Sequence, residues 1–339
     1  MKSLLKISNL ETSFFTHAGE VKAVRGADLD VSEGEAIGIV GESGCGKSVT
    51  MLSILGLLED TGKIKNGSAV FNGVDLLKMS KDEMMNIRGN EISMVFQDPM
   101  TALNPVFTIG NQLTEPLLRH TDLTKSKAKE KAAEYMKLVG IPEADRRLKQ
   151  YPHEFSGGMR QRVMIAMALI CSPKLIIADE PTTALDVTIQ AQILDLFKDI
   201  KNKLNTSIIL ITHDLGVVAE FCSRINVMYG GVIVESGSKY DIFYKPSHPY
   251  TLGLLASVPN PKTMIKERLK PIAGQPPDLI KPPAGCPFIP RCKHALNICA
   301  KEMPPYFRID ENHTARCWLH HEDAAAFSCF KRSEENGAR

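Results

Sequence analysis

Long apolar segments and a strong charge of either sign are both absent from this sequence of 339 residues. No stretch approaches the ~18 uninterrupted apolar residues of a membrane-spanning helix, so we expect no transmembrane segment. The formal net charge is only +2, which gives no reason to expect nucleic acid or an anionic membrane as a partner. The first residues hold only short apolar runs, so we expect no secretory signal peptide and place the chain in the cytoplasm.

Closely spaced cysteine pairs are absent as well, although the chain has eight cysteines. Four of them gather toward the C-terminus, at Cys286, Cys292, Cys299 and Cys317. A reducing compartment argues against disulfides, and four thiolates are enough to hold zinc or an iron–sulfur cluster. The spacing matches neither the short C-x-x-C-type pairs of structural zinc nor the ferredoxin runs. It therefore leaves zinc, an iron–sulfur cluster and free thiols open.

The segment GESGCGKS at residues 41–48 matches the phosphate-binding pattern G-x-x-x-x-G-K-[ST] at every fixed position. An apolar run at residues 36–40 predicts a strand before it, and residues 49–58 predict a helix after it. Glycines let successive N–H groups turn toward one anion, and the helix N-terminus adds its dipole. We therefore expect Lys47 to reach the β- and γ-phosphates of a nucleotide and Ser48 to ligate Mg²⁺. The residues expected to contact the nucleotide here are Gly41, Ser43, Gly44, Cys45, Gly46, Lys47, Ser48 and Val49.

Further polar residues stand where predicted strands end or where a predicted helix begins. An apolar strand ends in Asp179 and Glu180, which could lie near Mg²⁺ and beside an attacking water. Gln97 and His213 follow two other strand-like runs, at the edge where open α/β sheets bind their ligands. Residues 156–158 precede a helical run and could hold a phosphate. Each feature alone has an ordinary structural explanation, such as a helix cap or a core contact, but their joint order favours a nucleotide site.

The order of predicted elements indicates an α/β fold. Residues 1–89 alternate short apolar runs with glycine turns, which is typical of a small β-layer, and residues 111–149 have helical periodicity. Two apolar strands flank a helical segment between residues 175 and 212, so we expect parallel β-α-β units. Residues 225–236 read as a hairpin. Nine prolines between Pro259 and Pro290 exclude regular helix or a central strand, and they predict an extended arm leading to the cysteines.

In this order and spacing, the motifs resemble those of the ATPase subunit of ABC transporters, over essentially the whole chain. In family terms residues 41–48 are Walker A, residues 155–162 are the signature, and Asp179 with Glu180 is Walker B. The resemblance makes Glu180 the general base and His213 the switch histidine that orients it. The other roles it implies fall on Gln97 (Q-loop, Mg²⁺ ligand), Ser156, Gly157 and Gly158 (γ-phosphate), Ala184, Leu185 and Asp186 (D-loop), and Phe14 or its neighbour Phe15 (adenine stacking).

The resemblance implies an α/β P-loop NTPase fold of the ABC-ATPase type. Such a fold combines a RecA-like core, an antiparallel β subdomain and a helical subdomain, the last at about residues 105–165. The ATPase domain would span residues 1–250, and a Pro- and Cys-rich C-terminal extension would span residues 251–339. Cys45 stands where serine is more usual. Only its backbone N–H should be needed, and its thiol is a candidate site for alkylating inhibitors.

Three further segments resemble the oligopeptide/dipeptide importer branch of the family: residues 96–105, residues 248–259 and residues 274–292. This resemblance implies an ATP-hydrolysing subunit that powers peptide import, with ATP and Mg²⁺ as cofactors. It also implies a 4Fe–4S cluster at the four cysteines, with Zn²⁺ as the alternative. The alternatives for function are import of nickel or another small solute, or a soluble ABC ATPase outside transport.

The family also implies several protein partners. A second ATPase subunit, either a copy of this chain or a homologue, would complete a head-to-tail dimer around two ATP molecules. Two transmembrane permease subunits and an extracytoplasmic solute-binding protein would complete the transporter, and no nucleic acid is expected. The chain would then be a peripheral protein at the cytoplasmic face of the cell membrane.

Overall fold

A computed structural model describes residues 2–183, 186–257 and 271–330 of the chain. Its strands form a four-stranded sheet in the order β2-β1-β4-β5 and an eight-stranded sheet in the order β11-β12-β10-β9-β3-β8-β7-β6. The strands are β1 (Ser3–Thr16), β2 (Gly19–Ser32), β3 (Ala36–Val40), β4 (Gly62–Phe71), β5 (Val74–Asp75), β6 (Ile92–Val95), β7 (Leu175–Asp179), β8 (Ser207–Thr212), β9 (Arg224–Tyr229), β10 (Val232–Ser238), β11 (Phe307–Asp310) and β12 (His313–Ala315).

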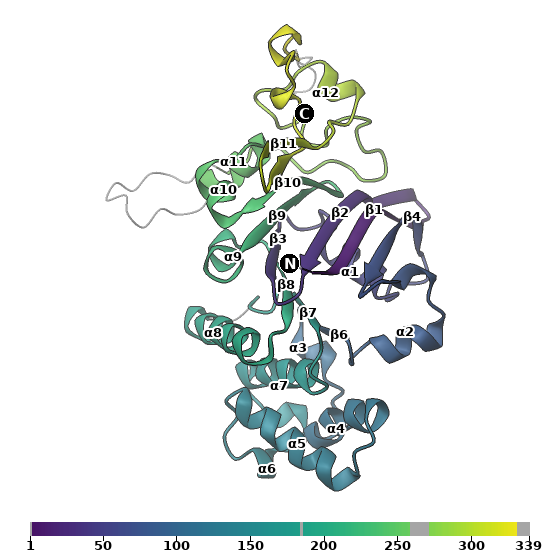
Figure 1. Ribbon diagram of the computed structural model, residues 1–339, viewed down its shortest axis with the longest axis vertical. Coiled ribbons are helices and arrows are strands. Elements are labelled where there is room, and N and C mark those ends of the chain that lie inside the picture. Colours follow the sequence, from purple (N-terminus) through teal and green to yellow (C-terminus); the bar gives the residue numbers. More distant parts are fainter. Residues whose placement is uncertain (1, 184–185, 258–270, 331–339) are drawn as a thin grey trace, which may run out of the picture.

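Helices pack beside both sheets and form one end of the molecule. Figure 1 shows α4, α5 and α6 gathered at the end opposite to the C-terminal region. The helices are α1 (Lys47–Ile54), α2 (Lys81–Ile87), α3 (Pro99–Ala102), α4 (Ile109–His120), α5 (Lys125–Leu138), α6 (Ala144–Arg147), α7 (Gly157–Leu169), α8 (Val187–Leu204), α9 (Leu215–Phe221), α10 (Lys239–Tyr244), α11 (Pro249–Ala256) and α12 (Ile298–Lys301).

The eight-stranded sheet has a parallel core. Strand β3 pairs in parallel with β8 and β9, and β7 pairs in parallel with β6 and β8. Every residue of β3, β7 and β8 is buried, as expected of parallel strands that are covered on both faces. The predicted parallel arrangement is confirmed, and so is the hairpin, in which β9 and β10 pair antiparallel around Gly230 and Gly231.

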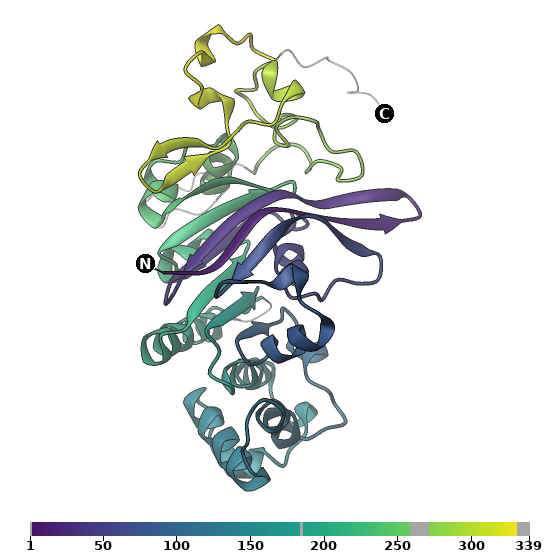
Figure 2. The same ribbon diagram turned by 45° about the vertical axis from the view of Figure 1, so that its right-hand side comes forward.

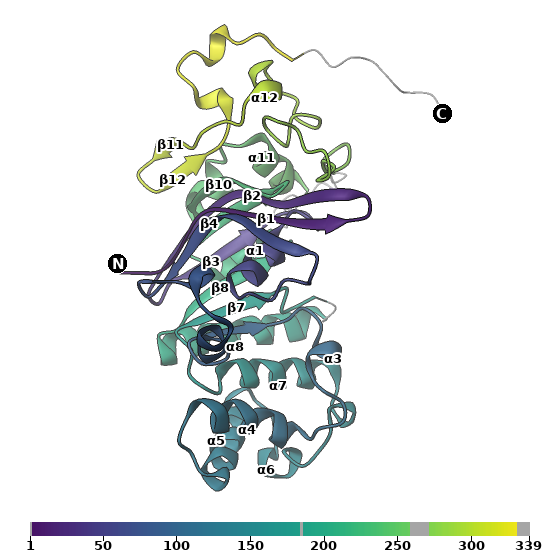
Figure 3. The same cartoon turned by 90° about the vertical axis from the view of Figure 1, so that its right-hand side faces the viewer.

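The four-stranded antiparallel sheet covers β3 and the helix α1 that follows it. Figures 2 and 3 show the long strands β1 and β2 crossing the middle of the molecule, with β4 beside them and α1 beneath. Leu5, Ile7 and Leu10 of β1 share one buried cluster with Ile39 of β3 and Met51 of α1. Burial of these apolar side chains fixes the position of the start of α1 relative to the sheet.

Helices α4, α5 and α7 pack together because apolar residues recur at three- and four-residue spacing. Ala128, Ala132 and Met136 of α5 are fully buried, as the periodicity predicts. Threonine or serine caps the N-terminus of each of these helices, through Thr108, Thr124 and Ser156. Helix α1 is shorter than its predicted range of 49–58: it begins at Lys47 and ends at Ile54, and Gly56 with φ +59° follows.

The C-terminal region joins the eight-stranded sheet. Strand β12 pairs antiparallel with β10 and with β11, so residues 307–315 extend the sheet at its β10 side. Residues 271–290 contain neither helix nor strand, as their prolines predict. In the described part of the chain, no helix is both long and apolar enough to cross a membrane.

Candidate functional site

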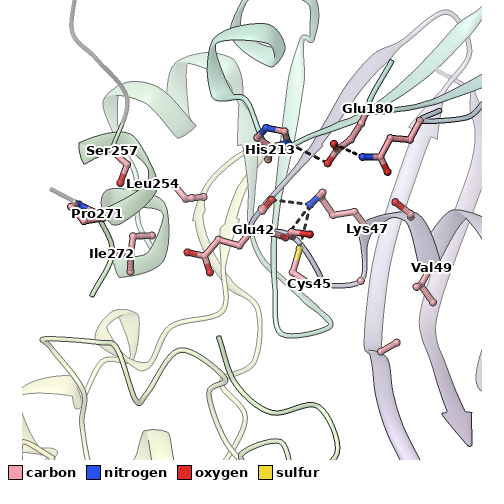
Figure 4. A pocket seen from close by; sticks show the side chains of 17 residues that line it. Glu42, Cys45, Lys47, Val49, Glu180, His213, Leu254, Ser257, Pro271 and Ile272 are labelled. Carbon is pink, nitrogen blue, oxygen red and sulfur yellow. Dashed lines mark hydrogen bonds and ion pairs between the residues drawn. The ribbon is translucent and has the colours of Figure 1, made fainter. Parts of the chain in front are cut away.

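A cavity of about 660 Å³ lies where β3, β7 and β8 end (Figure 4). It gathers most of the residues singled out in the sequence onto one surface. The residues that line it are Ala23, Gly41, Glu42, Ser43, Gly44, Cys45, Gly46, Lys47, Ser48, Val49, Gln97, Glu180, His213, Leu254, Ser257, Pro271 and Ile272. Strand ends of an open α/β sheet are where such proteins bind ligands.

The phosphate loop wraps around the ammonium group of Lys47. Its Nζ donates hydrogen bonds to the carbonyl oxygens of Gly41, at 2.8 Å, and Glu42, at 3.0 Å. Gly46 has φ +104°, and a Cβ there would lie 2.5 Å from the carbonyl oxygen of Ala23, so only glycine fits. The loop therefore holds one positive charge at the N-terminus of α1, where backbone N–H groups also favour an anion.

Ser48 and Asp179 join the start of α1 to the end of β7. The Ser48 hydroxyl donates to Oδ1 of Asp179 at 2.8 Å. Burial raises the pKa of the Asp179 carboxyl, and the nearby Glu180 raises it further, while Ser48 and Lys47 act in the opposite direction. Magnesium commonly takes one or two protein oxygens and completes its shell with water and phosphate, so this hydroxyl–carboxylate pair suits Mg²⁺.

Glu180 is held by side chains from two further strand ends. Its Oε1 lies 3.2 Å from Nδ1 of His213, and its Oε2 accepts from Nε2 of Gln97 at 3.1 Å and from Oγ1 of Thr183 at 2.8 Å. In Figure 4 a dashed line joins the neighbouring side chains of His213 and Glu180. The backbone of Glu180 has φ +45°, a conformation that residues other than glycine rarely adopt and that recurs at active sites. The sheet thus aims one carboxylate at the space above Lys47.

The cavity does not include every residue that the resemblance assigns to the nucleotide. Residues 156–158 do not line it; Ser156 caps α7 by accepting from the backbone N–H of Met159. Phe14 and Phe15 do not line it either: Phe14 packs against Gly62, and Phe15 is 41% exposed beside two lysines. Ala184 and Leu185 of the expected D-loop lie outside the described residues. The roles of all these residues remain predictions.

Sequence reasoning missed the part of the cavity wall that comes from the C-terminal half. Leu254, Ser257, Pro271 and Ile272 line the cavity, and the hydroxyl of Tyr250 accepts from the backbone N–H of Glu42 at 2.9 Å. These contacts join positions roughly two hundred residues apart, as the Glu42–Tyr250 separation of 208 shows. No spacing pattern along the chain signals such pairs.

The four clustered cysteines line a second, small cavity together with His248 and His294. Burial raises the pKa of the Cys286 and Cys317 thiols to about 12, and the neighbouring thiols add to the rise. Across the described ranges, no group of three or more His, Cys, Asp or Glu side chains is arranged to hold a metal ion. The donor chemistry of four sulfurs on one interior cavity nevertheless suits zinc or an iron–sulfur cluster.

A phosphate loop, a carboxylate-bearing strand end, and glutamine and histidine on adjoining parallel strands define a P-loop ATPase. Residues 24–183 match the family described as "ABC transporter", and residues 234–299 match "Oligopeptide/dipeptide transporter, C-terminal region". The chain belongs to the family of ATP-binding subunits of oligopeptide and dipeptide ABC transporters, and it is an ATPase. The predicted family and fold class are confirmed.

Relatives match along nearly the whole chain. The dipeptide transport ATP-binding protein DppD of Bacillus subtilis is 55% identical over 325 residues, which cover 96% of this chain and 97% of that protein. The oligopeptide transport ATP-binding protein OppD of the same species is 53% identical over 322 residues, or 95% of this chain and 90% of that protein. The dimeric ATP-binding cassette MJ0796, solved in a post-hydrolysis state with ADP and Pi, has a TM-score of 0.63 and 30% identity. The match covers 70% of this chain and 99% of the MJ0796 chain.

Proposed function

We propose that this chain hydrolyses ATP in the cavity above the phosphate loop and thereby powers peptide import by an ABC transporter. The observation that carries the proposal is the Glu180 carboxylate, which faces the cavity of the phosphate loop and is held there by Gln97 and His213. The names of the relatives support peptides as the cargo class.

The residues that line the cavity, together with Asp179 at the end of β7, divide the chemical work. Lys47 and the backbone N–H groups of residues 41–48 bind the phosphates and stabilise the charge that develops on them. Ser48 and Asp179, with Gln97, supply the oxygen ligands for Mg²⁺, which polarises the phosphates when it is bound. Glu180 takes the proton of the attacking water, and His213 keeps the carboxylate oriented.

A second ATPase subunit completes the site in this proposal. Residues 156–158 open an α-helix of 13 residues and do not line the cavity of their own chain. They therefore remain available to the γ-phosphate held by another subunit, in a head-to-tail dimer. Supporting this arrangement, the related cassette MJ0796 was solved as a dimer. Two permease subunits, and an extracytoplasmic solute-binding protein beyond them, would carry the peptide, with this chain peripheral at the cytoplasmic face of the membrane.

The Glu180→Gln variant tests the catalytic assignment. We expect it to bind ATP as the wild type does and to lose nearly all turnover, because an amide cannot accept the proton. Glu220→Gln is the matched control, since Glu220 is an exposed carboxylate on α9 that pairs with Lys198. Full hydrolysis by Glu180→Gln would contradict the assignment. ATP turnover that peptides stimulate after reconstitution with the permease subunits tests the cargo class. Stimulation by a nickel chelate and not by peptides would show that the cargo is the chelate.

We further propose that Cys286, Cys292, Cys299 and Cys317 hold a 4Fe–4S cluster. All four line one interior cavity, and His248 lines it as well. Its Nδ1 accepts from the backbone N–H of Tyr250, so the ring proton sits on Nε2, which is buried and has no hydrogen-bond partner among residues 2–183, 186–257 and 271–330. A buried N–H of this kind is costly unless it donates to a group in that space. A bound cluster would hold the four cysteines as thiolates and would fix the segments of the C-terminal extension that carry them.

Iron, acid-labile sulfide and zinc, measured per chain on protein purified without oxygen, test this assignment. About four irons and four sulfides, lost in Cys292→Ser and retained in Cys329→Ser, are the expected result. Cys329 is the matched control because it is exposed and does not line the cavity. One zinc per chain would establish the alternative metal, and the absence of any metal would reject both metal assignments.

A further inference from the structure

The carboxylate of Glu42, in the phosphate loop, is held by an arginine from the C-terminal extension. Nη1 and Nη2 of Arg291 lie 2.6 and 2.9 Å from the two carboxylate oxygens of Glu42, so the pair is bidentate across 249 positions of sequence. The arginine side chain is 3% exposed and that of Glu42 is 26% exposed. A bidentate, largely desolvated pair of this kind is among the stronger polar contacts in proteins.

Arg291 uses all five of its N–H donors. Beyond the two bonds to Glu42, Nη1 donates to the Tyr229 hydroxyl, Nη2 donates to the carbonyl of Ile272, and Nε donates to the carbonyl of Ala273. An arginine that meets five acceptors in a fixed fork is a positioned group, and lysine cannot reproduce the set. Its position is therefore set by the sheet and the extension together.

Every polar group of Glu42 is likewise engaged. Its backbone N–H donates to Tyr250, its carbonyl accepts from the ammonium of Lys47, and its carboxylate binds Arg291. Glu42 also lines the phosphate cavity. An unneutralised carboxylate at this point would repel a triphosphate, and the guanidinium of Arg291 cancels that charge.

We propose that Arg291 is a positioning residue for nucleotide binding, because it holds the phosphate loop through Glu42 and neutralises the Glu42 charge. The extension is then a part of the nucleotide site. This inference rests on the proposed function, in that it requires ATP to bind at the phosphate loop. It gives a nucleotide-site role to Arg291, which lies in one of the segments that resemble the importer branch but was not predicted to contact the nucleotide.

The ratio of ATP affinity to ADP affinity tests the charge argument. ATP carries one more negative charge than ADP, so Arg291→Gln, which exposes the Glu42 carboxylate, should lower the preference for ATP by about threefold. Glu42→Gln leaves the guanidinium uncompensated and should raise that preference by a similar factor. The double variant should return close to the wild-type ratio. If the two substitutions only damaged the structure, they would shift the ratio of ATP affinity to ADP affinity in the same direction as one another, or not at all.

Equilibrium binding of fluorescent ATP and ADP to the full-length chain gives these ratios. Arg316→Gln is the matched control, since Arg316 lies in the extension, donates to the carbonyl of Pro304, and does not line the phosphate cavity. Shifts of the same sign in the two single variants, or ratios that stay within the error of the wild type, would overturn the proposal. If Arg291→Gln does not fold, the rise expected for Glu42→Gln decides alone, and its absence overturns the proposal.

The Lys47→Ala variant separates this inference from the proposed function. Loss of nucleotide binding in Lys47→Ala together with unchanged ratios in the Arg291 and Glu42 variants would reject only the role of Arg291. Nucleotide binding that survives in Lys47→Ala would reject the site itself.

Discussion

Glu235 is a fully buried carboxylate that ties the C-terminal extension to the ATPase sheet. It lies on β10 with no exposed surface, and three groups donate to it. The backbone N–H groups of Ser247 and His248 lie 2.6 and 3.0 Å from its oxygens, and Nε2 of His313 on β12 lies at 2.8 Å. Glu235→Ala would remove both carboxylate oxygens from three donors at once, of which those of His248 and His313 are buried and that of Ser247 is half-buried.

The magnitude follows from those three donors. A buried donor left without a partner costs about 1–3 kcal/mol, and entry of water into the vacated space recovers part of this cost. We therefore expect Glu235→Ala to lower the free energy of unfolding by about 4 kcal/mol. Glu235→Gln keeps the shape and one acceptor oxygen, so its cost should be about 1–2 kcal/mol.

The single tryptophan of the chain makes this effect measurable. Trp318 lies in the extension, is 7% exposed, and packs edge-on against Phe307 and Phe327. Its fluorescence reports unfolding of the extension, whereas far-UV circular dichroism reports the whole chain. With a urea dependence of about 2 kcal/mol per molar, the fluorescence midpoint of Glu235→Ala should fall by about 2 M.

The control is Glu33→Ala, because Glu33 forms an exposed ion pair with Lys2 that contributes little. Its fluorescence midpoint should stay with that of the wild type. A midpoint shift below about 0.5 M in Glu235→Ala would refute the reasoning, since it would mean that the three donors find other acceptors at almost no cost.

Two further predictions concern the nucleotide site. Burial raises the pKa of the Cys45 thiol, so alkylation of Cys45 should be slow at neutral pH and should quicken as the pH rises. It should also be far slower than alkylation of the exposed Cys329. Peptide mass spectrometry measures both rates, and rapid labelling of Cys45 at neutral pH would contradict the prediction. Burial also raises the pKa of Asp179, so ionisation of Asp179 opposes folding as the pH rises through that pKa. Without nucleotide, Asp179→Asn should therefore have a higher melting temperature than the wild type near pH 7, and the difference in melting temperature should shrink in acid. A melting temperature that is lower at neutral pH, measured by calorimetry, would show that the carboxylate stabilises the empty site.

The sequence predicted those parts of the site that depend on local pattern. The phosphate loop and the buried strand before it could be predicted, because the glycine spacing and the apolar run that indicate them lie within a few residues of one another. Glu180 and His213 could be placed at strand ends for the same reason, and parallel pairing then brought them together. The parallel sheet could be predicted from the alternation of strands and helices along the chain, and the hairpin from its turn residues.

The parts that escaped prediction are contacts between distant segments. Arg291 and Glu42 follow no period, and neither residue type signals the other at a separation of 249 positions. Ile272 lines the cavity, and Tyr250 contacts Glu42 in its wall, only because segments far apart in the sequence fold together. The end of α1 was placed too late, because Gly56 terminates the helix before its apolar pattern ends.

The outer strands of the eight-stranded sheet determine how exposed its edges are to other chains. Strands β6 and β11, at the two edges, have four residues each, and β11 carries Arg308 and Asp310 as exposed charges. Without β12, the seven-residue strand β10 would be an edge with unpaired backbone groups, the kind of surface onto which foreign strands add. Strand β12 thus pairs with part of an edge that would otherwise be open, and among the described residues the sheet ends in strands of four residues on both sides.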